Sequence, residues 1–361
     1  MTATVCESIQ WRATLDLEER ARRLHEFLPP RRLDSDALLS RIERLERLYD
    51  VFRRTAPVPA WGSGLVVTEE MHRQVEVYLP LADIGCAFAP ALRLASAPSH
   101  GGTALATEPS WYGFLDELSL PCFPANPAEA LRLFCGDYDF RLRFLFALFI
   151  PRHFGGKFSR YPAQMRQALH FLRRLGRPVR CLDAACGTGE QAWELAGALR
   201  KAEIPAEVEG ASVNAVEIFG AAHGFFPDNP ARERRHREEM HRVLDNGAAG
   251  LLFRVEDLLA SPKPPEHLYD LIFCNGFLGG PFLHDAELIR RTVQYLARRL
   301  KPGGLLMASH SFHGGWKKKV PLQMLVEALR QAGLRNIEAD EGVAGEQVAD
   351  EGGEDIVSRR R

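Results

Sequence analysis

The order of apolar and amphipathic segments after residue 160 constrains the fold more than any other feature of this sequence. Five apolar segments have the length and composition of strands: 179–183, 206–213, 251–255, 269–274 and 304–309. Helical periodicity marks the stretches around them, at 161–175, 189–201, from 215, 230–244, 285–300 and 320–332. Strands that alternate with helices predict an α/β fold, with a Rossmann-like, doubly wound, mostly parallel sheet. Ligands of such sheets bind at the carboxyl ends of the strands.

The length of 361 residues is enough for about two domains. We assign residues 1–150 to a largely helical or irregular N-terminal region and residues 151–340 to the ligand-binding α/β domain. Residues 341–361 are rich in Gly and acidic side chains, a composition typical of disorder. A disordered tail is therefore expected there.

Within the N-terminal region, apolar residues at spacings of three and four predict one long helix. Asp34 or Ser35 is expected to cap its start, and the helix is expected to run to about Arg54. Many Pro and Gly residues between 56 and 126 indicate loops and short helices. Residues 127–150 are rich in Phe and predict a pair of helices whose rings pack in a core.

The composition argues against several classes of protein. Lys and Arg number 46 against 47 Asp and Glu, so no net field attracts nucleic acid, and no nucleic-acid partner is expected. No apolar run reaches the ~20 residues of a membrane span, and charges occupy the N-terminus where a signal peptide needs an apolar core. Seven cysteines without a CxxC pair indicate reduced thiols and no metal site. These features predict a cytoplasmic protein, and they leave its oligomeric state open.

The segment DAACGTGE contains the most specific motif in the chain. A strand is expected to end at Asp183, and a helix is expected to begin near Glu190 after a Gly-rich turn. Gly187 and Gly189 have no Cβ, so a ligand can approach the backbone closely there. The free N–H groups at a helix N-terminus suit a carboxylate or a phosphate.

Two cofactors compete for this turn. Gly187, Gly189 and Ala192 satisfy the loose GxGxxA pattern of dinucleotide sites, which is the signature of a nicotinamide-dependent oxidoreductase. The carboxylate of Asp183 would repel a pyrophosphate, however, and would attract the ammonium and sulfonium of S-adenosyl-L-methionine (SAM). The sequence therefore favours SAM.

The segment resembles motif I, D-x-x-C-G-x-G, of the class I SAM-dependent methyltransferases. The Leu-Lys-Pro-Gly-Gly run that begins at Leu300 is also similar to a turn characteristic of that family. The resemblance implies that SAM contacts come from Asp183, Ala185, Gly187, Gly189, Glu190, Ser212, Asp257, Leu258 and Asn275.

Two of these positions qualify the resemblance. The family has an acid at the end of the second strand to hold the ribose, where this chain has Ser212, and Glu209 is the alternative ribose ligand. Asp257 and Leu258 match the acid and the apolar residue that contact the adenine in the family. The competing interpretation of Asp257 is a solvated loop aspartate.

Residues 150–335 also resemble the CheR-type chemotaxis-receptor methyltransferases, which esterify glutamate side chains. The family motif F-C-R-N is similar to the run from Phe273 to Gly276, although Asn275 and Gly276 replace its Arg and Asn. A Tyr of the family falls at Gly280, and 223–250 has a helical pattern where the family has a small β-subdomain. The acceptor therefore stays open, and a carboxylate on a protein or small molecule is the first expectation.

A carboxylate acceptor needs no base, whereas a hydroxyl or an amine usually does. His310 is the first candidate for a base, with His313 and His284 as further candidates. Asn275 is a candidate for binding the acceptor or the amino-acid end of SAM, and the alternative is a structural amide.

Thr188 with Gln191 forms a capping-box pattern. Glu190 either contacts the methionine moiety or stabilises the helix start through its dipole.

These observations predict a CheR-like, SAM-dependent methyltransferase. The alternative is a non-catalytic SAM-binding or scaffold protein, motivated by Ser212 and Gly280. A nicotinamide-dependent oxidoreductase is the third hypothesis.

Overall fold

The computed structural model describes residues 9–56, 66–95, 108–118, 120–150, 156–245, 250–260, 267–280, 283–309 and 319–348. The chain divides into two compact units. The first comprises Met1–Gly156, Val213–Leu244 and Phe253–Val255, and the second comprises Lys157–Ser212, Asp245–Leu252 and Glu256–Arg361. Val213–Leu244, expected in the α/β domain, therefore belongs to the first unit.

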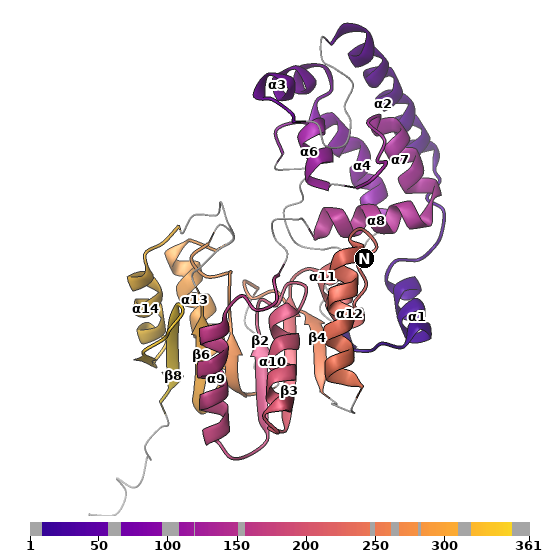
Figure 1. Ribbon diagram of the computed structural model, residues 1–361. Coiled ribbons are helices and arrows are strands. Elements are labelled where there is room, and N and C mark those ends of the chain that lie inside the picture. Colours follow the sequence, from indigo (N-terminus) through magenta and orange to yellow (C-terminus); the bar gives the residue numbers. More distant parts are fainter. Residues whose placement is uncertain are drawn as a thin grey trace, which may run out of the picture. The chain divides into compact units, whose positions relative to one another are not determined.

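The first unit consists mostly of helices, many of them drawn in purple in Figure 1. They are α1 Leu17–Phe27, α2 Asp36–Thr55, α3 Glu69–Tyr78, α4 Leu81–Ala95, α6 Trp111–Leu118, α7 Pro127–Gly136, α8 Tyr138–Phe149, α11 Ala215–His223 and α12 Pro230–Leu244. Among the described residues, no single helix is long and apolar enough to cross a bilayer, although the bent pair α3 and α4 passes that test together.

Local sequence signals explain most of these helices. Ser35 caps α2, as predicted, because its side chain accepts a hydrogen bond from the Leu38 N–H. The rings of Phe134 and Phe144, on α7 and α8, pack edge to face at 5.2 Å in the predicted Phe core. In the described part of 56–126, the expected short helices are α3, α4 and α6, and the Pro80 carbonyl accepts hydrogen bonds from the first turn of α4.

His223 closes α11 inside the apolar core of the first unit. Its Nδ1 lies 2.9 Å from the Phe219 carbonyl oxygen, and its Nε2 lies 3.2 Å from a guanidinium nitrogen of Arg23. This arrangement requires a neutral ring, with Nδ1–H as donor and Nε2 as acceptor. Burial, together with the charge of Arg23, lowers the pKa of His223 to about 4.

The strands form one mixed sheet in the order β1-β4-β3-β2-β5-β6-β8-β7. They are β1 Gln10–Arg12, β2 Val179–Asp183, β3 Ala206–Ser212, β4 Leu251–Val255, β5 Tyr269–Phe273, β6 Leu300–Ala308, β7 Leu334–Ile337 and β8 Val343–Gln347. β2 pairs in parallel with β3 and β5, and β5 pairs in parallel with β6. These pairings confirm the doubly wound, mostly parallel α/β fold.

The helices described in the second unit are α9 Pro162–Arg174, α10 Glu190–Lys201, α13 Ala286–Ala297 and α14 Leu322–Gln331. Figure 1 shows α9 and α10 in front of the sheet. Leu182, Ile272 and Leu306 point to the opposite face, where they share a core with residues of α13 and α14. Because side chains alternate along a strand, Asp183 points to the face opposite that of Leu182.

The Lys-Pro-Gly-Gly run was predicted to form a turn before the strand at 304–309, but it lies inside β6. The register with β5 jumps there, from Tyr269 opposite Leu300 to Leu271 opposite Leu305. Gly304 is required at this bulge, because a Cβ would lie only 2.8 Å from the Lys301 carbonyl oxygen.

The expectation of disorder from residue 341 is wrong for the described part of the tail. β8 lies between β6 and β7 and is antiparallel to both. The two described glycines of the tail are packing requirements: a Cβ on Gly342 would overlap the Ala308 carbonyl oxygen, and one on Gly345 would crowd Leu334 at 3.0 Å. Residues 349–361 lie outside the described residues.

Candidate functional site

The Gly-rich turn connects Asp183, the last residue of β2, to Glu190, the first of α10. Gly187 and Gly189 have φ angles of +53° and +86°, which side chains other than glycine rarely adopt. A Cβ on Gly187 would meet nothing within 4 Å, so open space lies above the turn. The turn therefore leaves its backbone accessible to a ligand.

The predicted capping box of Thr188 and Gln191 is wrong. Gly189 is the N-cap of α10 and makes no side-chain capping bond, because its left-handed conformation starts the helix. The Thr188 hydroxyl instead donates to the buried carboxylate of Glu190, 2.8 Å from each oxygen. A contact of Glu190 with a ligand stays a prediction.

Asp183 is an ionisable group in a buried position of the second unit. Its side chain is only 2% exposed, and its carboxylate accepts hydrogen bonds from the backbone N–H groups of Ala185 and Ala192. Its Oδ2 atom is buried and has no hydrogen-bond partner among the described residues. Burial raises the pKa of Asp183 to about 7, against the two N–H bonds, and the negative charge of Glu190 contributes to the rise. A cation beside Oδ2 would favour the ionised form.

Ser212 ends β3 and is buried, and its carbonyl accepts a hydrogen bond of 2.9 Å from the Glu256 N–H. The alternative ribose ligand, Glu209, is placed elsewhere. It lies opposite Leu182 in the sheet, so it points to the face away from Asp183, and it accepts a hydrogen bond of 2.8 Å from the Tyr269 hydroxyl. The structure therefore contradicts a ribose role for Glu209.

Asp257 and Leu258 follow β4. Asp257 is exposed, and its Oδ1 accepts a 2.8 Å hydrogen bond from the Leu259 N–H, which closes its own turn. Leu258 is buried in the core shared with α13. This geometry matches a loop aspartate, and an adenine contact stays a prediction.

Asn275, just beyond β5, belongs to a buried amide cluster that we define as Gln164, Gln191 and Asn275. Asn275 Nδ2 donates to Gln164 Oε1 at 2.6 Å and to Gln191 Oε1 at 2.8 Å. Asn275 Oδ1 accepts from Gln164 Nε2 at 3.1 Å and from the Ser309 N–H at 2.5 Å. Both Nδ2 and Oδ1 of Asn275 are therefore hydrogen-bonded within the protein, which matches the alternative that Asn275 is a structural amide.

Sequence reasoning missed Gln164, which is fully buried on α9. The signal is its spacing: Gln164, Ala168 and Leu172 are the buried residues of α9, four apart, so a polar residue occupies an apolar stripe. The Gln164 N–H donates to the Glu341 carboxylate at 2.9 Å, so a residue far along the chain caps α9.

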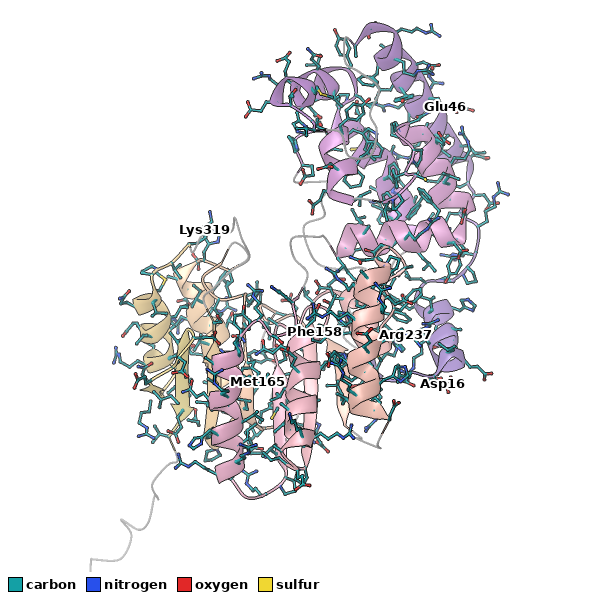
Figure 2. All side chains as sticks on the ribbon, viewed as in Figure 1. Asp16, Glu46, Phe158, Met165, Arg237 and Lys319 are labelled. Carbon is teal, nitrogen blue, oxygen red and sulfur yellow. The ribbon has the colours of Figure 1, made fainter. Side chains whose placement is uncertain are left out.

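A cation also lies near the carboxyl end of β5. A Cβ on Gly276 would be 3.9 Å from a guanidinium nitrogen of Arg160 and 3.9 Å from the Tyr161 hydroxyl. The guanidinium of Arg160 lies 5.0 Å from the centre of the Tyr161 ring. Arg160 and Tyr161 follow Phe158, which is labelled in Figure 2.

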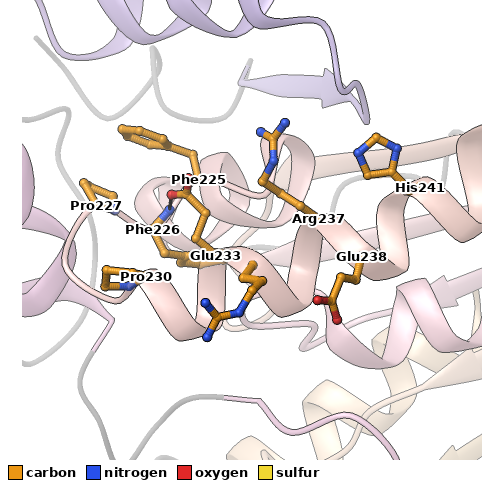
Figure 3. Close-up of a pocket in the computed structure, with 9 residues that line it drawn as sticks. Phe225, Phe226, Pro227, Pro230, Glu233, Arg237, Glu238 and His241 are labelled. Carbon is orange, nitrogen blue, oxygen red and sulfur yellow. Dashed lines mark hydrogen bonds between the residues drawn. The ribbon is translucent and has the colours of Figure 1, made fainter.

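Of the histidine candidates for a base, His310 and His313 lie outside the described residues, and His284 is exposed just before α13. Among the described residues, no group of His, Cys, Asp and Glu can hold a metal ion. The pocket in Figure 3 lies in the first unit, around Phe225 and α12, and none of its lining residues belongs to the predicted site.

A scan against protein-family models gives no match, and neither does a search of curated proteins. Among solved structures, the chain is similar to a SAM-dependent methyltransferase from Methanosarcina mazei, with 15% identity, a TM-score of 0.36, and coverage of 51% of this chain and 98% of that chain. The N-methyltransferase NodS from Bradyrhizobium japonicum, in complex with S-adenosyl-L-homocysteine, is 16% identical, with a TM-score of 0.34 and coverage of 53% of this chain and 89% of that chain. A SAM-bound amino pentose methyltransferase from Micromonospora echinaspora is 15% identical, with a TM-score of 0.33 and coverage of 54% of this chain and 99% of that chain. The fold is established by the strand order and register, and no argument rests on these distant similarities.

Proposed function

We propose that the second unit binds SAM at the Gly-rich turn and transfers its methyl group. The buried carboxylate of Asp183, whose Oδ2 has no partner among the described residues, is the observation that carries this proposal. A positive charge placed beside this carboxylate would stabilise its ionised form, and SAM carries an ammonium and a sulfonium. A dinucleotide would place a pyrophosphate near the same carboxylate, which disfavours the nicotinamide-dependent alternative.

The residues of the turn fit the amino-acid end of SAM. Asp183, which already accepts from the Ala192 N–H in the first turn of α10, would hold the ammonium, and the N–H groups at the start of that helix suit the α-carboxylate. Gly187 leaves space for the remainder. Ser212 offers a hydroxyl for the ribose in place of an acid.

The proposal extends to a carboxylate acceptor, on a protein or a small molecule. Arg160 and Tyr161 support it, because a guanidinium and a phenol suit a carboxylate and both lie beside the end of β5. A carboxylate is ionised at neutral pH, so this chain needs no general base. When bound, SAM supplies the electrophilic methyl group. Holding the acceptor oxygen in line with it lowers the barrier by roughly 7–11 kcal/mol.

A non-catalytic SAM-binding or scaffold role is the second candidate. The engaged amide of Asn275 favours it, because that residue has no polar group left to bind an acceptor. The replacement of the ribose acid by Ser212 points the same way.

Calorimetric titration with SAM and S-adenosylhomocysteine tests the cofactor. Binding should be lost in Asp183→Asn and kept in Glu207→Gln, which removes an exposed carboxylate from neighbouring β3. Methyl-labelled SAM then reports transfer to carboxylate acceptors. SAM binding without transfer to any acceptor would favour the second candidate. NADH binding without SAM binding would contradict the proposal.

A further inference from the structure

A second pocket, of about 200 Å³, lies in the second unit between α13 and the segment that follows β4. Leu258 and Leu259 form part of one wall. Arg291, Thr292 and Tyr295 line it from α13, and Arg298 lines it from the C-cap position of that helix. Its volume is below the roughly 300–1,000 Å³ of drug-sized sites, so it suits a small molecule.

Thr292 gives the pocket an unsatisfied polar group. Its side chain is 1% exposed, and its Oγ1 makes no hydrogen bond within the part of the chain that the structure describes. A helical threonine ordinarily bonds a carbonyl one turn earlier, and buried hydroxyls are nearly always paired. A polar ligand atom in the pocket would provide the missing partner.

The charges around the pocket are positive. Arg291 and Arg298 are exposed and lie seven residues apart, which places them on one face of α13. None of the described lining residues is acidic. Of the acids next to the lining residues in sequence, Asp257 accepts a hydrogen bond from the Leu259 N–H, Glu287 pairs with Arg290, and Glu256 pairs with Arg299 and accepts a hydrogen bond from Tyr295. An anion is therefore favoured, and the leucines favour an apolar body.

We infer that this pocket is a second ligand site, which binds a small organic anion with an apolar body, such as an aromatic carboxylate. The carboxylate lies between Arg291 and Arg298 and accepts from the Thr292 hydroxyl, while the ring packs on Leu258 and Leu259. The inference shares Leu258 with the predicted adenine contact, but none of its contacts involves the Gly-rich turn, and benzoate binding in the absence of SAM is tested separately from the proposed function.

Benzoate is the probe, titrated into the purified full chain and followed by calorimetry and by saturation transfer from protein to ligand. Thr292→Val keeps the side-chain shape without the hydroxyl and should weaken binding about tenfold, as should Arg291→Ala. Arg290→Ala is the matched control, because it removes a guanidinium from the same helix outside the pocket. Circular dichroism checks that each variant is folded.

Inorganic phosphate, an anion without an apolar body, should bind more weakly than benzoate. The inference is overturned if the wild type binds no benzoate at millimolar concentration. It is equally overturned if Thr292→Val and Arg291→Ala bind benzoate as the wild type does, or if Arg290→Ala weakens binding as much as Arg291→Ala.

Discussion

Asp183→Asn should stabilise the ligand-free protein while abolishing the binding of SAM. Burial, helped by the charge of Glu190, raises the pKa of Asp183 from 3.8 to about 7. A group whose pKa is raised by folding contributes stability that is complete below pH 3.8 and is lost as the pH rises through about 7. At about 1.4 kcal/mol per unit, the ionised carboxylate costs up to about 4 kcal/mol above that pH.

Urea unfolding of the full chain at about pH 5 and about pH 8.5 measures this cost. Asp183→Asn has no charge to bury, so it should gain on the wild type by about 3 kcal/mol between the two pH values, because only the part of the pKa rise that lies above pH 5, about two pH units, counts there. Glu207→Gln, at an exposed carboxylate, should show no such gain. A variant that is less stable than the wild type by the same amount at both pH values would refute the reasoning.

Proton release gives an independent measure of the same group. A cation beside Asp183 lowers its pKa, so SAM binding at about pH 6 should release close to one proton, and binding well above pH 7 should release none. Calorimetry in buffers of different ionisation enthalpy counts these protons. Proton uptake at about pH 6 would show that the ligand does not place its cation at Asp183.

Three further changes test other parts of the structure. The lowered pKa of His223 means that its stability contribution is complete above pH 6.5 and falls by up to about 3 kcal/mol toward pH 4; His223→Gln should flatten that loss in urea unfolding. Gly342→Ala should lower Tm by several degrees, since its Cβ overlaps the Ala308 carbonyl oxygen, whereas Gly333→Ala, in open space at φ +81°, should cost only about 1 kcal/mol. Gln164→Ala should cost roughly 2–4 kcal/mol in chemical denaturation by leaving its partner amides unsatisfied; an unchanged midpoint would mean that water replaces it.

The elements predicted best are those whose signal is local. The strands at 179–183 and 251–255 match β2 and β4 to the residue, because short apolar runs between polar or Gly-containing segments define both ends. Asp183 and the two glycines of the turn were placed for the same reason. The order of apolar, amphipathic and Gly-containing segments therefore predicted the fold class and the turn without any knowledge of distant contacts.

The misses are features that depend on distant partners. Gln164 and Asn275 are 111 residues apart, so neither residue alone signals their shared hydrogen bonds. β8 has little apolar pattern. Gly342, just before it, and Gly345, within it, are required only because Ala308 of β6 and Leu334 of β7 pack against them. Thr188 and Gln191 fit a capping box in sequence, but the left-handed Gly189 starts the helix instead.

The order of strands at the β6 side of the sheet governs when the second unit can be completed during synthesis. β7 leaves the ribosome before β8, yet β8 lies between β7 and the rest of the sheet. β7 therefore has no place in the sheet until its successor has inserted. The same late segment supplies Glu341, whose carboxylate binds the N–H of Gln164, 177 residues earlier. A nascent chain that stops before this segment has an uncapped α9 and a truncated sheet, so the second unit should fold only after nearly all of it has been translated.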